Sequence, residues 1–142
     1  MRFGRSSKVA VLEKVPLFRD LSRKQLEQIA RLADELDVPA GKRLATAGAS
    51  GHELFVVVEG RATVSVTRGR TVRLGPGDFF GEMSLLDGKP RSATVDADSP
   101  MRLLVVGGRE FWQLLTAAPP LALAIMKTLS GRVRDAEAAI SA

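Results

Sequence analysis

The stretch FFGEMSLLDGKPRSATV, residues 79–95, decides how this sequence is interpreted. Gly81 lets the backbone approach a ligand without a side chain in the way. Residues 82–86 are good helix formers and Gly88 can end a helix, so we expect a short helix here whose first N–H groups face outward. Arg91 adds a permanent positive charge with a planar fork of donors, which suits phosphate oxygens. Glu82 adds one carboxylate. From these residues alone, the stretch is predicted to be an anion-binding loop.

Short strands separated by glycine turns surround this loop. Residues 54–59 are apolar on both faces, and Ala62, Val64 and Val66 alternate with polar residues, which is typical of a half-buried strand. Tight turns are expected at residues 68–70 and 75–78. The predicted strands lie around residues 36–38, around Leu44, and at 54–59, 62–67, 71–74, 93–97 and 102–106. Such a series favours a rolled antiparallel sheet over alternating strands and helices.

Helices are expected at both ends of the chain. Residues 8–17 predict a short helix that stops near Pro16. Ser22 and Gln25 form a capping-box pattern before an amphipathic helix over residues 23–34. A short helix is expected at 110–116, and a long one begins at Pro119 and runs to about Ile140. We therefore expect one domain over residues 1–142, with helices at about 8–34, a β-roll at about 35–107 and C-terminal helices at about 108–140.

Composition narrows the possible functions. The 142 residues include no cysteine, no tyrosine and a single histidine, His52. Disulfides, thiolate metal sites, iron–sulfur clusters and a cysteine nucleophile are excluded, and one histidine cannot supply the cluster of metal ligands of a cupin-like enzyme. We expect no catalytic residue, no metal and no enzymatic activity.

Charge and hydropathy indicate where the protein acts. No apolar run approaches the roughly 20 residues that a membrane helix needs. The basic N-terminus lacks a secretory core and a cleavage site, so we expect a cytoplasmic protein with no membrane association. The net charge is +5 and the pI about 10.2, but the basic residues are scattered. This pattern favours ordinary solvated surface over a nucleic-acid face.

The same stretch, residues 80–95, resembles the phosphate-binding cassette of cyclic-nucleotide-binding domains. These domains are the sensors of catabolite activator proteins, of protein kinase A regulatory subunits and of cyclic-nucleotide-gated channels. The likeness extends over residues 15–140, because AGKRL at 40–44, ELFVVVEG at 53–60 and LGPGDF at 74–79 resemble other family segments. It implies an eight-stranded, jelly-roll-like antiparallel β-roll with N-terminal helices and a long C-terminal helix, in a bacterial signalling protein.

The resemblance also implies roles for individual residues. Glu82 would accept a hydrogen bond from the ribose 2′-hydroxyl, and Arg91 would pair with the cyclic phosphate. The backbone donors and cassette positions implied at the ligand are Gly81, Met83, Ser84, Ser92 and Ala93. The apolar bed of the pocket would be formed by Val64, Val72 and Leu74. No cofactor is implied; the ligand would be cAMP or, second, cGMP.

Two positions bear on the choice of nucleotide. In catabolite activator proteins the C-terminal helix offers hydroxyl groups to the purine, whereas the corresponding residues here, Ala136 and Glu137, have none. Family members that favour cGMP often carry threonine directly after the cassette arginine, and this chain has Ser92. The comparison favours cAMP.

The C-terminal helix is the expected relay. Ligand binding would reposition residues 121–140 about a hinge at Pro119 and Pro120. One apolar stripe, spaced by three and four residues, either packs on the domain's own sheet or forms the seam of a homodimer. Its members are Met126, Leu129, Val133, Ala136 and Ile140.

Other functions stay open. A transcription factor needs a helix-turn-helix after the long helix, and because the chain stops at Ala142 we expect no DNA-reading element in it. If the chain is part of a larger protein, such as a transcription regulator, channel or transporter, that protein would supply the effector domain that the sensor controls. A roll that has lost its ligand and only mediates protein contacts is the further alternative, which Glu82 and Arg91 argue against.

Overall fold

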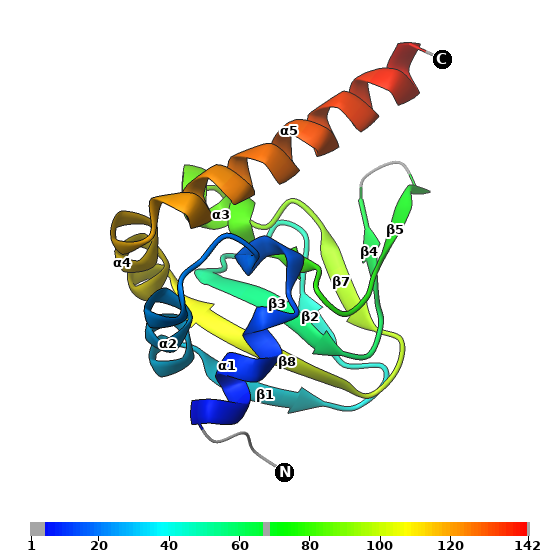
Figure 1. Ribbon diagram of the computed structural model, residues 1–142. Helices are drawn as coiled ribbons and strands as arrows, with labels where there is room; N and C mark the ends of the chain where they lie inside the picture. The colour runs from blue at the N-terminus through cyan, green and yellow to red at the C-terminus, as the bar shows by residue number, and fades with distance from the viewer. Residues whose placement is uncertain (1–4, 67–68, 142) are drawn as a thin grey trace.

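A computed structural model describes residues 5–66 and 69–141 of the chain (Figure 1). Its helices are α1 (Arg5–Glu13), the short 3-10 helix η1 (Pro16–Phe18), α2 (Arg23–Leu32), α3 (Glu82–Asp87), α4 (Gly108–Ala117) and α5 (Pro119–Ser141). Its strands are β1 (Asp34–Val38), β2 (Arg43–Ala45), β3 (Glu53–Glu59), β4 (Ala62–Ser65), β5 (Thr71–Leu74), β6 (Phe79–Phe80), β7 (Thr94–Ala97) and β8 (Met101–Gly107). The expected strand end at Thr67 and turn residue Arg68 lie outside the described residues.

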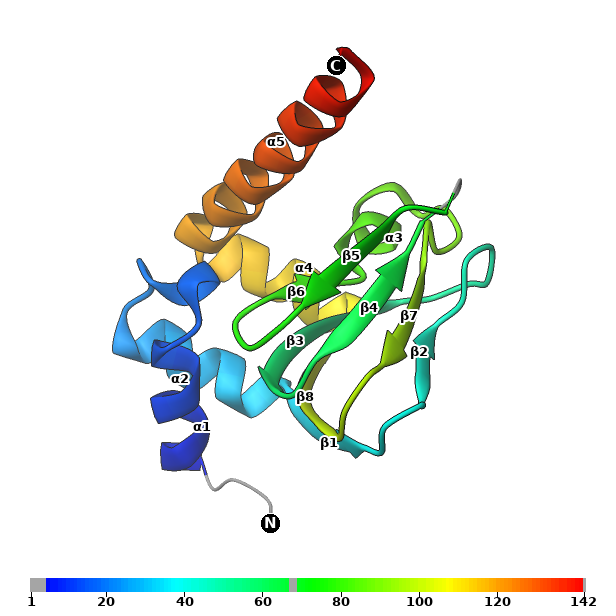
Figure 2. The same cartoon turned by 90° about the vertical axis from the view of Figure 1, so that its right-hand side faces the viewer.

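The strands form two four-stranded sheets. One has the order β1-β8-β3-β6 and the other β2-β7-β4-β5, and every pair of neighbours is antiparallel. The two sheets face each other as the walls of a roll, as Figure 2 shows. The predicted antiparallel roll with helices at its ends is therefore confirmed.

The central strands of the β1-β8-β3-β6 sheet, β8 and β3, are buried on both faces, which explains why they lack alternation. Leu54 and Val56 of β3 join a cluster on the helix side, whereas Phe55 and Val57 join a cluster inside the roll. β8 divides its side chains in the same way. A strand enclosed between a second sheet and a layer of helices has no polar face, and it reads as a continuous apolar run.

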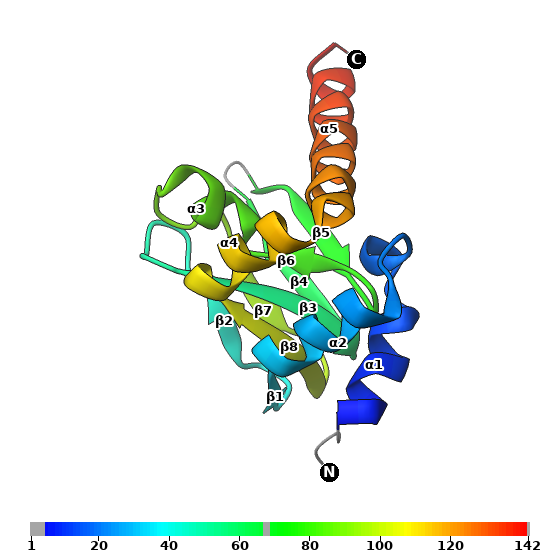
Figure 3. The same ribbon diagram turned by 60° about the vertical axis from the view of Figure 1, so that its left-hand side comes forward.

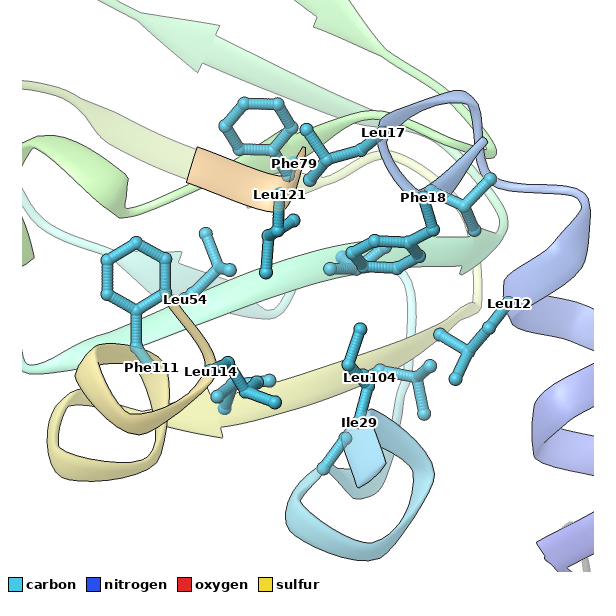
Figure 4. Close-up of a cluster of buried hydrophobic side chains, with 14 of the residues drawn as sticks. Leu12, Leu17, Phe18, Ile29, Leu54, Phe79, Leu104, Phe111, Leu114 and Leu121 are labelled. Atoms are coloured by element: carbon cyan, nitrogen blue, oxygen red, sulfur yellow. The ribbon is translucent and has the colours of Figure 1, made fainter. Parts of the chain in front are cut away.

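The helix-side cluster closes one face of the roll. Helices α2 and α4 lie across the sheet, as Figure 3 shows, and α1 packs on α2. Figure 4 shows Ile29, Phe111 and Leu114 reaching from these helices into the cluster, with Phe111 beside Leu54 on β3. Phe111 is fully buried. Apolar burial of this kind is the main favourable term in folding.

Several helix boundaries differ from the sequence prediction; α4, for example, extends over Gly108–Ala117 instead of 110–116. The Ser22–Gln25 capping box is confirmed, with reciprocal bonds of 3.2 and 2.9 Å. However, α2 ends at Leu32, because Asp34 already pairs with Val105 on β8. The first helix begins at Arg5 and ends at Glu13, and Pro16 opens the separate 3-10 helix η1 instead of closing α1.

Helix α5 leaves the domain. It is bent by 110° from α4 across Ala118, and its C-terminal half projects beyond the roll (Figures 1 and 2). Its first turns are anchored in the helix-side cluster by Leu121 and Ile125, and Leu129 packs against that cluster. Within the described ranges no single helix has the length and hydropathy to cross a membrane; only α4 and α5 counted together, bent as they are, meet that criterion.

Candidate functional site

The stretch from Phe79 to Thr94 turns sharply into the predicted helix. Gly81 has a φ of 95°, a left-handed conformation that favours glycine, and it precedes α3 as its N-cap. Gly88 follows α3, and its N–H donates to the carbonyl oxygen of Ser84 at 3.0 Å. The short helix expected from residues 82–86 is therefore confirmed, and it holds Glu82 in its first turn.

Buried polar side chains gather in this stretch. Among the described residues, only Glu82, Ser84 and Arg91 are polar or charged and buried, with 3%, 5% and 8% exposure. Burying a charge is costly unless it is paired and hydrogen-bonded. Two buried charges of opposite sign within one loop are therefore the strongest indication of a functional site in the described chain.

Arg91 lies in a well-defined seat. Nη1 donates to the carbonyl oxygen of Gly81 at 3.0 Å, and Nη2 donates to that of Glu53 at 3.1 Å. The guanidinium lies over the ring of Phe55, 5.8 Å from its centroid, and Phe55 stacks on Phe80 at 4.8 Å. Burial lowers the pKa of Arg91, while the charges of Glu53 and Glu82 oppose that shift. The cation is fixed in place by its backbone partners and by an aromatic surface.

Glu82 has a partner that the sequence did not reveal. Arg132 of α5 forms an ion pair with it, donating from Nη1 to Oε1. Nη2 of Arg132 donates to the carbonyl oxygen of Phe79 at 3.2 Å, and the guanidinium lies over the Phe79 ring. The Glu82 carboxylate is expected to accept a hydrogen bond from a ribose hydroxyl. In this structure it accepts one from Arg132 of the C-terminal helix instead.

The expected apolar bed lies on β4 and β5. Val64 is opposite Val72, and Leu74 is opposite Ala62, so that all four share one face. Leu74 is buried in the cluster inside the roll and Val64 packs against that cluster. Val72 is half exposed. The structure places the three residues together as a surface, although Val72 is largely uncovered.

The remaining cassette residues lie at the rim. Met83 and Ser92 are exposed, and the Ser92 hydroxyl donates to the Met83 sulfur at 3.7 Å. Ala93 is half-buried just before β7. These side chains extend the site around Arg91 and Glu82 but are not enclosed.

Two clefts adjoin the site. One, of about 210 Å³, takes in Arg91 and Phe55; it is also lined by Arg43, Leu44, Ala45, Thr46, Ala49, Ser50, Gly51 and Glu53. The expected pocket residues Glu82, Val64, Val72 and Leu74 do not line it. A larger cleft of about 390 Å³ lies between η1 and α5, with Phe79 and Arg132 in its wall. Arg91 thus lines the smaller cleft, whereas Arg132, the partner of Glu82, lines the larger one. Glu82 itself lines neither cleft.

Within residues 5–66 and 69–141, no group of three or more histidine, cysteine, aspartate or glutamate side chains could hold a metal ion. His52 is exposed in the segment before β3.

Sequence reasoning missed Arg132, Glu53 and Phe55. Arg132 is one of several basic residues on α5, and no local pattern separates it from Lys127 or Arg134. Glu53 contributes only its backbone oxygen, which any residue type would supply. The sequence predicts a strand at 54–59 that is apolar on both faces, but the contact of Phe55 with a cation 36 positions later in the chain depends on tertiary structure.

Comparison with known proteins places the site in context. A model of the cyclic nucleotide-binding domain matches residues 35–118. The chain is 43% identical over 114 residues to a cyclic nucleotide-gated potassium channel of Mesorhizobium japonicum, covering 80% of this chain and 32% of the channel. It is 36% identical over 113 residues to a cAMP-dependent protein kinase regulatory subunit of Mycosarcoma maydis, covering 73% of this chain and 22% of that subunit.

A solved structure of another protein has a similar fold. The Thermus thermophilus catabolite activator protein is 29% identical, with a TM-score of 0.80 over 89% of this chain and 62% of that one. The chain thus spans between a fifth and two thirds of the proteins that it resembles.

Proposed function

The chain belongs to the cyclic nucleotide-binding domain family, and from that premise we propose that it is a sensor module that binds cAMP at Glu82 and Arg91 and relays binding through α5. One observation carries the proposal: the two charged side chains buried in the described chain have opposite signs and lie within ten positions of each other. A ligand that offers a phosphate and a neighbouring hydroxyl satisfies both.

Arg91 is suited to the cyclic phosphate. Two of its five N–H groups are used by the carbonyls of Gly81 and Glu53. We propose that the others donate to the phosphate oxygens, with the guanidinium held over Phe55. We propose that backbone N–H groups of Gly81, Ser84 and Ala93 and the hydroxyl of Ser92 add further donors.

The nucleoside would occupy the space between the cassette and β4–β5. Glu82 would accept from the ribose 2′-hydroxyl, with Met83 beside it at the rim. The base would lie on Val64, Val72 and Leu74. Val72 is half exposed, so its side chain has apolar surface left that a bound base would bury.

We propose cAMP as the nucleotide and cGMP as the weaker ligand. A relative that is 36% identical is named as a cAMP-dependent regulatory subunit. Ser92 stands where cGMP-binding members often have threonine. Neither Ala136 nor Glu137 offers a hydroxyl to the purine, so we expect the base to contribute less to affinity than the ribose and the phosphate.

The relay would begin at the ion pair between Glu82 and Arg132. A ribose hydroxyl at Glu82 competes with Arg132 for the same carboxylate oxygens. A ligand shifts a conformational equilibrium only through a difference in its affinity for the two states. Because Arg132 belongs to α5, that competition provides such a difference.

We further propose that the module is regulatory and not enzymatic, that it acts in the cytoplasm, and that it forms part of a larger protein such as a channel, transporter or transcription regulator. A ligand-free interaction module is the second candidate. The pairing of Glu82 with a side chain of the protein itself favours it, because the carboxylate is already satisfied.

Isothermal titration with cAMP, cGMP and cyclic dinucleotides tests the proposal on the wild type and on Arg91→Ala. A charged hydrogen bond contributes about 1.5–3 kcal/mol, so Arg91→Ala should weaken cAMP binding at least about tenfold. The matched control is Arg73→Ala, since Arg73 is exposed on β5 and points away from the face that carries Val72 and Leu74. No heat and no thermal shift with any cyclic nucleotide would instead support the interaction module.

A further inference from the structure

Gly51 lies against the guanidinium of Arg91. A Cβ atom built on Gly51 would overlap Nε and Cζ of Arg91 and lie 2.5 Å from Nη2. Non-bonded heavy atoms cannot approach so closely, so any side chain at position 51 requires Arg91 to move. Its neighbour here is a flexible side chain and not backbone, and the substitution would therefore shift the cation and leave the strands in place.

The glycine is not needed for backbone conformation. Seven other glycines of the described chain have positive φ values, and Gly51 is not among them. An alanine at position 51 therefore avoids the strain of a left-handed conformation. Glycine is needed at this position because it has no Cβ atom, and the Arg91 guanidinium occupies the place where a Cβ atom would lie.

The loop that carries Gly51 also holds the backbone of Arg91. The N–H of Gly48 donates to the carbonyl oxygen of Arg91 at 2.8 Å, and the N–H of Arg91 donates to the carbonyl oxygen of Ala49 at 2.8 Å. Residues 48–51 thus fix the Cα position of Arg91 and, at the same time, contact the far end of its side chain.

Gly81 bounds the other side of the guanidinium. A Cβ atom at Gly81 would lie 2.7 Å from Nη1, and the Gly81 carbonyl accepts from that same nitrogen. The planar group is therefore seated between two glycines, with Phe55 beneath it and the carbonyls of Gly81 and Glu53 at its edge.

We propose that Gly51 is a positioning residue, which sets where the Arg91 guanidinium lies and thereby where a cyclic phosphate binds. The consequence for affinity rests on the proposed function; the seating of Arg91 does not. A methyl group at position 51 would push the guanidinium out of reach of at least one of its two carbonyl partners. The phosphate would then meet a cation that must be reoriented on binding.

The first test needs no ligand. In protein labelled with nitrogen-15 at arginine, the Arg91 guanidinium of the wild type should give observable side-chain resonances. Its hydrogen bonds to two carbonyl oxygens should slow the rotation of the group and the exchange of its protons. Gly51→Ala should shift or broaden these resonances and leave the backbone spectrum of β3 and β7 unchanged. The control is Gly75→Ala, because Gly75 has no atom within 4 Å of its virtual Cβ and no positive φ. Unchanged Arg91 resonances in a folded Gly51→Ala protein would overturn the proposal.

The second test measures cAMP affinity. Gly51→Ala should weaken binding by about fivefold or more, and Gly75→Ala by less than twofold. In an Arg91→Lys background the same change at position 51 should cost less than twofold, because lysine has no planar group for the methyl to displace. An equal loss in both backgrounds would mean that Gly51 acts on the fold and not through Arg91. If the wild type bound no cyclic nucleotide, the proposed function would be wrong. The Arg91 resonances would still show whether Gly51 positions the guanidinium.

Discussion

Arg132 of α5 forms an ion pair with Glu82 of α3, although the two residues are 50 positions apart in the chain. Glu82 is almost fully buried, whereas Arg132 remains 43% exposed. The pair therefore joins an interior carboxylate of the site to the helix that projects from the domain. It is the direct polar link between the proposed ligand site and the proposed relay.

Removing this link should loosen α5. In Arg132→Ala, Glu82 stays buried and loses its cationic partner, so we expect the free energy of unfolding to fall by about 1–2 kcal/mol. Amide hydrogen exchange in the first half of α5 should become faster. Arg134→Ala, on the exposed part of the same helix, serves as control. Equal exchange rates in the wild type and in Arg132→Ala would show that the pair does not restrain the helix.

The role of Glu82 can be isolated with a modified ligand. Glu82→Gln keeps the shape of the side chain and removes its charge. We expect wild-type protein to bind 2′-deoxy-cAMP at least about tenfold more weakly than cAMP, since a hydrogen bond to a charged group is lost. In Glu82→Gln the two ligands should differ by less than about threefold. A preference for cAMP that survives the substitution would assign the 2′-hydroxyl to another group.

The exposed stripe on α5 predicts association. Met126 and Val133 are 58% and 56% exposed, whereas Leu129 packs on the helix-side cluster. Ala136 is exposed, and the Ile140 side chain lies outside the part of the chain that the structure describes. Homodimerisation along this stripe therefore stays a prediction, in which Met126 and Val133 supply the apolar contact.

Val133→Lys should weaken such a dimer at least about tenfold by placing a charge in the contact. Ala138→Lys adds the same charge about 140° around the helix, at 100° per residue, and should leave association unchanged. Sedimentation equilibrium of both variants and the wild type would measure the effect. A wild type that stays monomeric at high concentration would contradict the seam.

Gly60 offers a test of the roll itself. It has a φ of 93°, and a Cβ atom there would overlap the carbonyl oxygen of Pro100 and lie 2.9 Å from the Cα of Met101. Gly60→Ala should destabilise the fold by about 3 kcal/mol or more, because the backbone of a neighbouring segment would have to move.

The matched control for Gly60 is Gly41→Ala. Gly41 has a similar φ of 86° and no atom within 4 Å of its virtual Cβ. It should cost only about 1–2 kcal/mol, the strain of a left-handed alanine. Urea unfolding of both variants gives the difference, and equal values would show that the close approach to Pro100 is relieved without cost.

The sequence predicted the local features well. The strand patterns, the capping box at Ser22 and the short helix after Gly81 all depend on neighbours within a few positions, and the structure confirms them. Element ends were less accurate where tertiary pairing competes, as when Asp34 joins β8 instead of extending α2.

The parts that escaped prediction depend on distant contacts. Arg132, Phe55 and the space above Gly51 become meaningful only once the chain brings them to Glu82 and Arg91. No periodicity or turn signal marks a glycine whose role is the room that it leaves for another side chain. Such a residue can be identified only from coordinates.

The bend at Ala118 turns α5 into a lever arm. With 23 residues and about 1.5 Å of rise per residue, the helix is about 35 Å long. A rotation of roughly 10° about its base would carry the far end through about 6 Å at that length, more than the diameter of a water molecule. Arg132 lies 14 residues beyond Ala118, about 21 Å along the helix, so loss of its bond to Glu82 would free most of the length of α5 to rotate.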